Sequence, residues 1–238
     1  MVESLQGKVT WITGASRGIG RATALAMARA GADVAVTART KDQLDALADQ
    51  IQAETGRRAL ACAADVAQEA DVTRAVRAAL ATFGRIDILV NNAGFNSRKA
   101  TLWEVTAEEW DAMMAVNLRG AFLCCREVLP AMIERRSGHI INVVSTAAEI
   151  GLENMGAYSA TKWGLLGMTR VLTKEARPYG IRVSAISPGG TDTTFRAMPR
   201  PDYLSPETVA EAIVFMASLP EQVVVHDLIV RPIVETNF

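Results

Sequence analysis

Short runs of β-branched residues alternate with alanine-rich segments of helical pattern along most of the chain, and this order limits the fold more than any other feature. A strand, a helix and a further strand in succession form a βα unit, whose strands lie parallel in one sheet. Strands are expected at residues 8–12, 32–37, 59–63, 85–90, 140–144, 181–186 and 223–230. Helices are expected at residues 21–30, 40–54, 69–82 and 106–135, through residues 158–162 to 176, and from residue 205. The pattern predicts an α/β fold, a doubly wound parallel sheet of about seven strands with helices on both faces.

Residue types at the helix ends support these boundaries. Residues 40–43 (Thr-Lys-Asp-Gln) and 106–109 (Thr-Ala-Glu-Glu) have the form of capping boxes, in which two side chains bond the free backbone N–H groups of a first helical turn. Pro206 follows Ser205, and proline is common at the first position of a helix. No linker, repeat or low-complexity segment interrupts the order, so residues 1–238 are expected to form a single domain.

Charge and composition exclude several functional classes. The 25 basic and 26 acidic residues give a net charge of −1, so neither a nucleic acid nor a membrane is an expected partner. No apolar run approaches the about 20 residues of a membrane-spanning helix, and the start of the chain lacks the features of a signal peptide. The three cysteines include the adjacent pair Cys124 and Cys125, and the two histidines lie far apart. No metal site is predicted, and a reducing, cytoplasmic setting is expected.

A glycine-rich segment, Thr13-Gly14-Ala15-Ser16-Arg17-Gly18-Ile19-Gly20, joins the first strand to the first helix. Glycines at such a turn let the backbone approach a pyrophosphate at the helix N-terminus. Glycines also make ordinary tight turns, and the spacing differs from Gly-x-Gly-x-x-Gly, but a strand before and a helix after are the context that a nucleotide-binding turn requires. The segment predicts a Rossmann fold that binds a dinucleotide.

The end of the second strand indicates which dinucleotide is bound. An acidic residue usually stands there and bonds the adenosine ribose, but this chain has Ala38 followed by Arg39. Arg17 adds a second cation inside the glycine-rich segment. Two arginines can hold a 2′-phosphate by charge-assisted hydrogen bonds, although both could also be merely solvated. The prediction is NADP(H) as cofactor, in preference to NAD(H).

Tyr158 and Lys162 are four positions apart and therefore share a face of the expected helix. A nearby ammonium favours the phenolate and lowers the pKa of tyrosine from about 10, which makes the phenol usable in proton transfer near neutral pH. Taken alone, a Tyr-x-x-x-Lys pair is common on solvated helix faces.

Together these residues resemble the short-chain dehydrogenase/reductase family, and in particular its members similar to 3-oxoacyl-acyl-carrier-protein reductases. The resemblance covers roughly residues 8–193, because the motifs occur in the family's order and spacing. It rests on Thr13-Gly14-x-x-x-Gly18-x-Gly20, Asn91-Asn92-Ala93-Gly94, Asn117, Ser145, Tyr158-x-x-x-Lys162 and Pro188-Gly189 with Thr193.

The resemblance implies a role for each matching residue. Tyr158 would protonate the carbonyl oxygen, Lys162 would bond the nicotinamide ribose and lower the tyrosine pKa, Ser145 would steady the developing alkoxide, and Asn117 would bend its helix around a proton-relaying water. These four are the predicted catalytic residues. The predicted cofactor-binding residues are Gly14, Ser16, Arg17, Gly18, Ile19, Gly20, Arg39, Asp65, Val66, Asn91, Ala93, Gly94, Tyr158, Lys162, Pro188, Gly189, Thr191 and Thr193.

The substrate site is expected to come from residues 145–205. Residues expected to touch the substrate are Asn96, Thr146, Ala147, Asn154, Met155 and Phe195. Residues 193–205, which cover the substrate in the family, look short here, so the pocket is expected to be open. The family's Asp-Gly-Gly ending, which often joins subunits, is absent, and this leaves dimer and tetramer as alternatives.

The implied activity is hydride transfer between NADP(H) and a carbonyl or secondary alcohol, with 3-oxoacyl thioesters or small ketones and aldehydes as candidate substrates. The alternative is a non-catalytic dinucleotide-binding module. A homo-oligomer is expected, because the resemblance implies that two of the helices pair subunits, and both carry apolar residues that core packing explains only in part. These residues are Phe122, Leu123, Leu129, Trp163, Leu165, Leu166, Met168, Val171 and Leu172.

Overall fold

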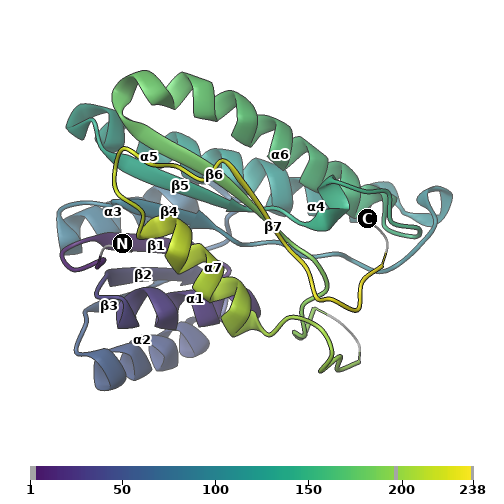
Figure 1. Ribbon diagram of the computed structural model, residues 1–238, viewed down its shortest axis with the longest axis horizontal. Helices are drawn as coiled ribbons and strands as arrows, with labels where there is room; N and C mark the ends of the chain where they lie inside the picture. The colour runs from purple at the N-terminus through teal and green to yellow at the C-terminus, as the bar shows by residue number, and fades with distance from the viewer. Residues whose placement is uncertain (1–3, 196–197, 237–238) are drawn as a thin grey trace.

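In the computed structural model of the protein, a parallel sheet runs through the middle of the molecule (Figure 1). Over the described residues, 4–195 and 198–236, it has seven strands in the order β3-β2-β1-β4-β5-β6-β7. The strands are β1 (Val9–Thr13), β2 (Asp33–Ala38), β3 (Ala59–Ala63), β4 (Ile88–Asn91), β5 (Gly138–Val143), β6 (Ile181–Pro188) and β7 (Asp227–Val230). The chain builds outward from β1 to β3, then returns to the centre at β4. This reversal confirms the predicted doubly wound, single-domain Rossmann-like fold, and it leaves a crevice beyond the carboxyl ends of β1 and β4.

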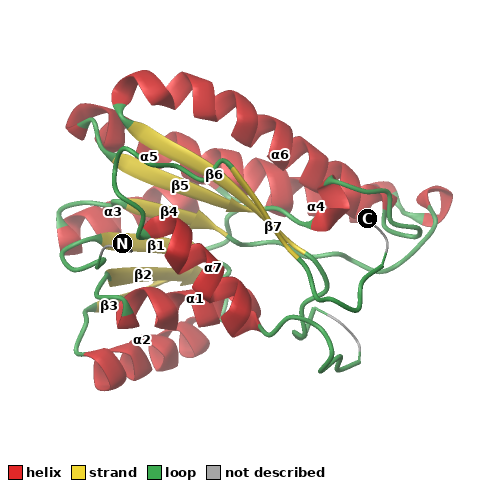
Figure 2. Cartoon of the chain, in the orientation of Figure 1, coloured by secondary structure: helices red, strands yellow, loops and turns green. Residues whose placement is uncertain are grey.

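Helices cover both faces of the sheet (Figure 2). One face packs on α1 (Gly18–Arg29), α2 (Lys41–Thr55) and α7 (Pro206–Ala217), and the other on α3 (Glu69–Phe83), α5 (Ala121–Arg135) and α6 (Gly156–Ala176). Consecutive strand residues point to opposite faces, so Trp11 packs with α3 and α5 while Ile12 packs with α1 and α2. Parallel strands that are buried on both faces have nearly continuous apolar sequences. This is why the sequence pattern predicted the positions of the strands.

The expected helix at residues 106–135 is one continuous rod with a change of winding inside it. It begins at α4 (Ala107–Met114), widens into a π-helix at Ala115–Gly120 and continues as α5. The capping box at its start is confirmed, because Glu109 N donates to Thr106 Oγ1 at 3.2 Å and Thr106 N donates to the Glu109 carboxylate at 3.0 Å. The π-helix contains Asn117, and such local widenings frequently occur at functional sites.

Three local predictions were wrong in detail. Strand β4 begins at Ile88, because the segment before it is held by the Arg85–Asp87 ion pair and by the bond from Val9 N to the Asp87 carboxylate. Strand β7 begins only at Asp227, the first residue paired with β6. At the start of α2, Thr40 makes no side-chain capping bond. Thr40 instead lines the cavity described below.

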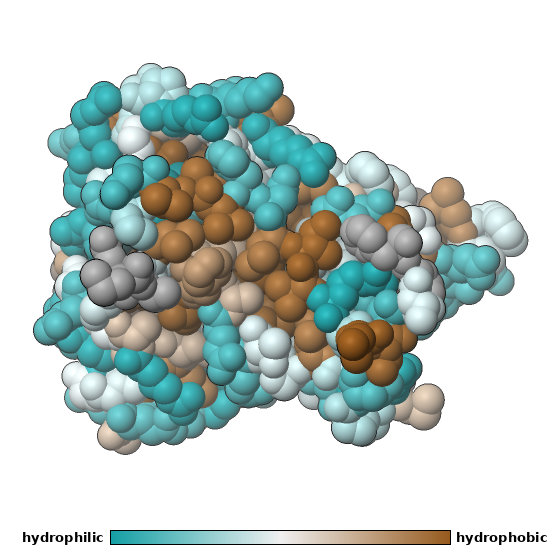
Figure 3. Space-filling view, in the orientation of Figure 1, coloured by the Kyte–Doolittle hydropathy of each residue, from teal (hydrophilic) through white to brown (hydrophobic). Residues whose placement is uncertain are grey.

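Hydrophobic residues gather on the face shown in Figure 3, over the region of α7 and β7. Phe215 of α7, Val223 before β7 and Ile229 within β7 are among the exposed large hydrophobic side chains. Among the helices in the described ranges, none is long and apolar enough to cross a membrane.

Candidate active site

A cavity of about 450 Å³ opens at the carboxyl ends of the central strands. It runs from the glycine-rich turn after β1, past the ends of β2 to β5, to the segment after β6 and the start of α6. The predicted site residues that line it are Gly14, Ser16, Arg17, Gly18, Ile19, Arg39, Asp65, Val66, Ala93, Gly94, Ser145, Thr146, Met155, Tyr158, Lys162, Pro188, Gly189, Thr191, Thr193 and Phe195. Residues from distant parts of the chain thus meet in one space.

The glycine-rich turn is closed tightly on itself. Gly14 and Gly18 have backbone φ angles of +66° and +55°, which residues other than glycine rarely adopt. At Gly20 an added Cβ would collide with the backbone oxygen of Gly14 and with the side chain of Asn92. Gly20 therefore allows the close packing of the turn against Gly14 and Asn92, and it does not itself line the cavity. The turn leads directly into the N-terminus of α1, where free backbone N–H groups attract an anion.

Two arginines stand at one end of the cavity. Arg17 lies in the glycine-rich turn, and Arg39 follows β2, with Ala38, Thr40 and Gln43 beside it. The tight turn, the helix N-terminus and the two guanidinium groups fit the phosphate groups of a dinucleotide.

Tyr158 and Lys162 lie at the other end, on the first turns of α6, and are 8% and 3% exposed. Lys162 Nζ donates to the carbonyl oxygen of Val143, at the end of β5, at 2.9 Å. The same ammonium lies 5.8 Å from the centre of the Tyr158 ring. Burial lowers the pKa of Lys162 to about 8, because the charged form loses hydration. Lys162 is therefore mainly protonated at pH 7 and loses its proton as the pH rises through about 8.

Ser145 and Asn117 differ in their relation to the cavity. Ser145 lines it directly after β5, and its Oγ accepts a bond from Ala147 N at 3.1 Å. Asn117 is 1% exposed and does not line the cavity. Its Oδ1 accepts from Phe95 N at 2.9 Å, and its Nδ2 donates to Phe95 O at 2.9 Å and to Thr161 Oγ1 at 3.1 Å. Asn117 thus links the loop after β4 to α6. Its partner on α6, Thr161, lies between Tyr158 and Lys162 in the sequence.

The wall expected to face the substrate is largely apolar. It contains Phe95, Leu152, Met155 and Phe195, and the rings of Phe195 and Tyr158 lie 5.7 Å apart. Phe195 thus stands beside the phenol at this end of the cavity and is itself 48% exposed. Residues 196–197 of the same segment lie outside the described residues.

Several sequence-based assignments are not brought together by the fold. Asn96, Asn154 and Ala147 do not line the cavity, and Ala147 is fully buried. The side chain of Asn91 turns into the core, where Nδ2 donates to Asn142 Oδ1 at 2.8 Å. Asn91 does not line the cavity, and its side chain is held between the ends of β4 and β5.

The residue after Asn91 does reach the cavity. Asn92 lines the cavity, and its Nδ2 donates to Thr13 O at 2.9 Å and to Gly14 O at 3.2 Å. The Asn-Asn pair in the sequence was the available signal: Asn91 is the last residue of β4 and bonds to Asn142 of β5, whereas Asn92 follows the strand and lines the cavity. Other lining residues that the sequence did not indicate are Ala38, Thr40, Gln43, Ala64, Phe95, Val116, Val143, Val144, Leu152, Gly190, Thr194 and Glu235.

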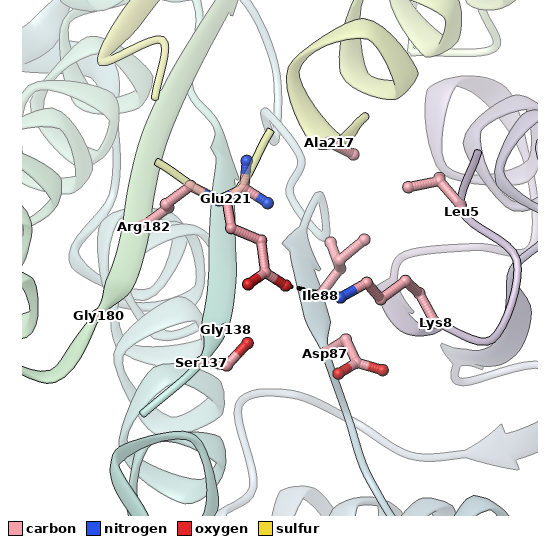
Figure 4. Close-up of a pocket in the computed structure, with 10 residues that line it drawn as sticks. All are labelled: Leu5, Lys8, Asp87, Ile88, Ser137, Gly138, Gly180, Arg182, Ala217 and Glu221. Carbon is pink, nitrogen blue, oxygen red and sulfur yellow. Dashed lines mark hydrogen bonds and ion pairs between the residues drawn. The ribbon is translucent and has the colours of Figure 1, made fainter. Parts of the chain in front are cut away.

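A second cavity of only about 30 Å³ lies at the opposite, amino ends of the strands (Figure 4). Lys8 Nζ and the Glu221 carboxylate pair across it at 2.9 Å, close to Asp87 and Arg182. It has room for about one water molecule, so it is not a candidate ligand site.

The fold and the large cavity define a Rossmann-like α/β protein of the dinucleotide-binding class. The chain belongs to the short-chain dehydrogenase family, whose model matches residues 8–203.

Among curated relatives, the chain is 40% identical over 228 residues to the 3-oxoacyl-[acyl-carrier-protein] reductase of Synechocystis, covering 91% of this chain and 92% of the relative. Among solved structures, it is similar to an alcohol dehydrogenase from the archaeon Thermococcus sibiricus complexed with 5-hydroxy-NADP, with TM-score 0.91, 31% identity and coverage of 97% and 99% of the two chains. It is also similar to a 3-ketoacyl-(acyl-carrier-protein) reductase from Brucella melitensis complexed with NADH, with TM-score 0.88, 37% identity and coverage of 96% and 98%. The chain is therefore an oxidoreductase of a family whose members bind NADP or NADH.

Proposed function

We propose that this protein is an NADP(H)-dependent oxidoreductase that interconverts a carbonyl compound and a secondary alcohol. The observation that carries the proposal is the layout of the large cavity. Tyr158, Lys162 and Ser145 line one end of it, and Arg17 and Arg39 line the other. A dinucleotide bound along such a cavity would have its 2′-phosphate at Arg17 and Arg39 and its nicotinamide at Tyr158.

The chain's own residues manage one proton and one developing charge. A bound nicotinamide supplies the hydride. Tyr158 donates its phenolic proton to the carbonyl oxygen as charge develops there, and Ser145 donates a hydrogen bond to the same oxygen. The ammonium of Lys162, 5.8 Å from the ring centre, favours the phenolate that remains. Asn117 acts as a positioning residue, through its bonds to Phe95 and Thr161.

The preference for NADP(H) rests on residues of this chain, because the family accepts both cofactors. An acid after β2 would repel a 2′-phosphate, and Ala38 removes that repulsion. Arg39 and Arg17 both line the cavity at this point and supply donors for the phosphate.

Two substrate classes fit the apolar wall. A 3-oxoacyl thioester is favoured by the similarity to reductases of that substrate in Synechocystis and Brucella melitensis. A small ketone or aldehyde is the alternative, since Phe195 narrows the space beside Tyr158.

A non-catalytic dinucleotide-binding module is the second candidate function. Such a protein would have no use for a buried lysine beside a tyrosine, because burying an ammonium opposes folding. Lys162 at 3% exposure therefore favours the enzyme.

The decisive experiment follows NADPH oxidation with a panel of carbonyls that includes acetoacetyl thioesters, simple ketones and aldehydes. Wild-type protein should turn over at least one class, and Tyr158→Phe should lower kcat by about 10²–10⁴-fold with cofactor affinity retained. Absence of turnover with every carbonyl, or equal turnover by Tyr158→Phe, would contradict the proposal.

We also propose that the protein is a cytoplasmic homo-oligomer. Its three cysteines are free and buried, in keeping with a reducing compartment. Of the apolar residues on the two helices, Leu123, Leu165 and Leu166 belong to the core, whereas Phe122, Trp163 and Val171 are 44%, 52% and 57% exposed. Light scattering of the native protein, with Trp163→Glu for comparison, tests this; a monomeric wild type contradicts it.

A further inference from the structure

After β7 the chain turns back, as the yellow segment in Figure 1 shows. Its Glu235 lines the large cavity near Pro188, Gly189 and Gly190. Glu235 Oε1 accepts a hydrogen bond from Gly190 N at 2.9 Å. Its Oε2 accepts one from Arg231 Nε at 3.2 Å. The turn between Pro232 and Glu235 is closed by a bond from Glu235 N to Pro232 O at 3.0 Å. One carboxylate thus joins the C-terminal segment to the cavity wall.

The backbone of Gly189 and Gly190 is held from several directions. Gly189 N donates to Val230 O at 2.8 Å, and Gly189 O accepts from Thr191 Oγ1 at 3.1 Å. Gly190 O accepts from Leu204 N at 3.0 Å. Glu235 provides the partner for the remaining group, Gly190 N. Without Glu235, that N–H would lose its partner in a half-buried turn.

Space around the turn is as constrained as its hydrogen bonds. A Cβ added to Gly189 would collide with Glu235 Oε2, and one added to Gly190 would collide with the ring of Tyr203. Glu235 therefore packs directly on one side of the two glycines, while Tyr203, at the base of the segment that carries Phe195, packs against Gly190. The side chains of Arg231 and Glu235 are only 15% and 20% exposed, so this contact is shielded from water.

We infer that Glu235 is a positioning residue, which acts through the Gly189–Gly190 turn to hold the nicotinamide end of the cavity in its binding geometry. This inference rests on the proposed function. It gives residues 231–235, which follow β7, a role at the large cavity of the same chain. The carboxylate bonds to the turn, and the turn lines the cavity where the nicotinamide would lie under the proposed function.

The test compares two ligands that differ in how far they extend along the cavity. NADPH reaches both ends, whereas adenosine 2′,5′-bisphosphate reaches only the arginine end. Fluorescence titration with NADPH, and competition by the bisphosphate, give both dissociation constants for wild type, Glu235→Ala and Glu235→Gln. Glu221→Ala is the matched control, because Glu221 also forms an ion pair, with Lys8, but at the opposite edge of the sheet.

Glu235→Ala is expected to weaken NADPH binding about tenfold, the size of a lost charged hydrogen bond. Bisphosphate affinity should stay within about twofold, and Glu235→Gln, which keeps an acceptor oxygen, should recover most of the NADPH affinity. Unchanged NADPH binding in Glu235→Ala, equal losses for both ligands, or a Gln variant as weak as Ala would overturn the inference. A wild type that binds neither ligand would instead refute the proposed function itself.

Discussion

Lys162 Nζ lies 2.9 Å from the carbonyl oxygen of Val143, so the buried ammonium of α6 is fastened to the end of strand β5. The bond fixes the distance between the helix that carries Tyr158 and the strand that leads to Ser145. It also places a positive charge where little water can reach it, and this has consequences for pH dependence and for stability.

The first prediction concerns activity at alkaline pH. Burial lowers the pKa of Lys162 to about 8, so the ammonium loses its proton as the pH rises through that value. The rate constant kcat/KM for carbonyl reduction, which reports groups of the free enzyme, should fall above an apparent pKa near 8. Because Lys162 and Tyr158 interact, this value belongs to the pair. A profile that stays flat to pH 9.5 would exclude this role of Lys162.

The second prediction concerns stability. The pKa of Lys162 is lowered to about 8 from 10.5, so the folded state binds this proton more weakly than the unfolded state does. The resulting penalty is complete below pH 8 and disappears as the pH rises to 10.5. Lys162→Met should therefore raise the free energy of unfolding at pH 7, by about 1–2 kcal/mol once the unpaired Val143 carbonyl is allowed for.

Urea unfolding at pH 7 and pH 10 measures this effect, and the advantage of Lys162→Met should shrink at the higher pH. The variant should have lost most reductase activity at both values. A variant that is less stable than wild type at pH 7 would show that the ammonium stabilises the fold.

The third prediction concerns the choice of cofactor. Arg39→Ala removes one guanidinium from the adenosine end of the cavity, so KM for NADPH should rise about 10–100-fold, the size of a lost charge-assisted hydrogen bond. KM for NADH should change less than about threefold, because NADH has no 2′-phosphate. Arg29→Ala, which removes an exposed guanidinium paired with Glu54 outside the cavity, is the matched control. Equal effects on both cofactors would argue that Arg39 is not a phosphate ligand.

The fourth prediction compares two glycines. Gly20→Ala places a Cβ against the Gly14 oxygen and the Asn92 amide, so the glycine-rich turn must open. Dinucleotide affinity should fall by at least about tenfold, and the free energy of unfolding by about 1–3 kcal/mol. Gly151→Ala, in the loop before α6, meets no atom within 4 Å, and Gly151 has no left-handed φ. This change should raise the free energy of unfolding by about 0.4–1 kcal/mol, because alanine leaves the unfolded chain fewer conformations than glycine does. Thermal unfolding and NADPH titration of both variants distinguish these outcomes.

Local pattern in the sequence determined the order of the βα units, the glycine-rich turn and the pairing of Tyr158 with Lys162. Each of these depends on residues near one another in the chain, where strand alternation, helix periodicity and the steric freedom of glycine act directly. The same local rules predicted both ends of the helical rod that contains Asn117.

The tertiary structure decided which side chains share the cavity. It placed Asn92 there in preference to Asn91, buried Asn117 as a link between the loop after β4 and α6, and buried Lys162 enough to lower its pKa. It also brought Glu235 to Gly190, 45 positions earlier in the chain. Such contacts depend on how separate elements pack against each other, and no local spacing encodes that packing.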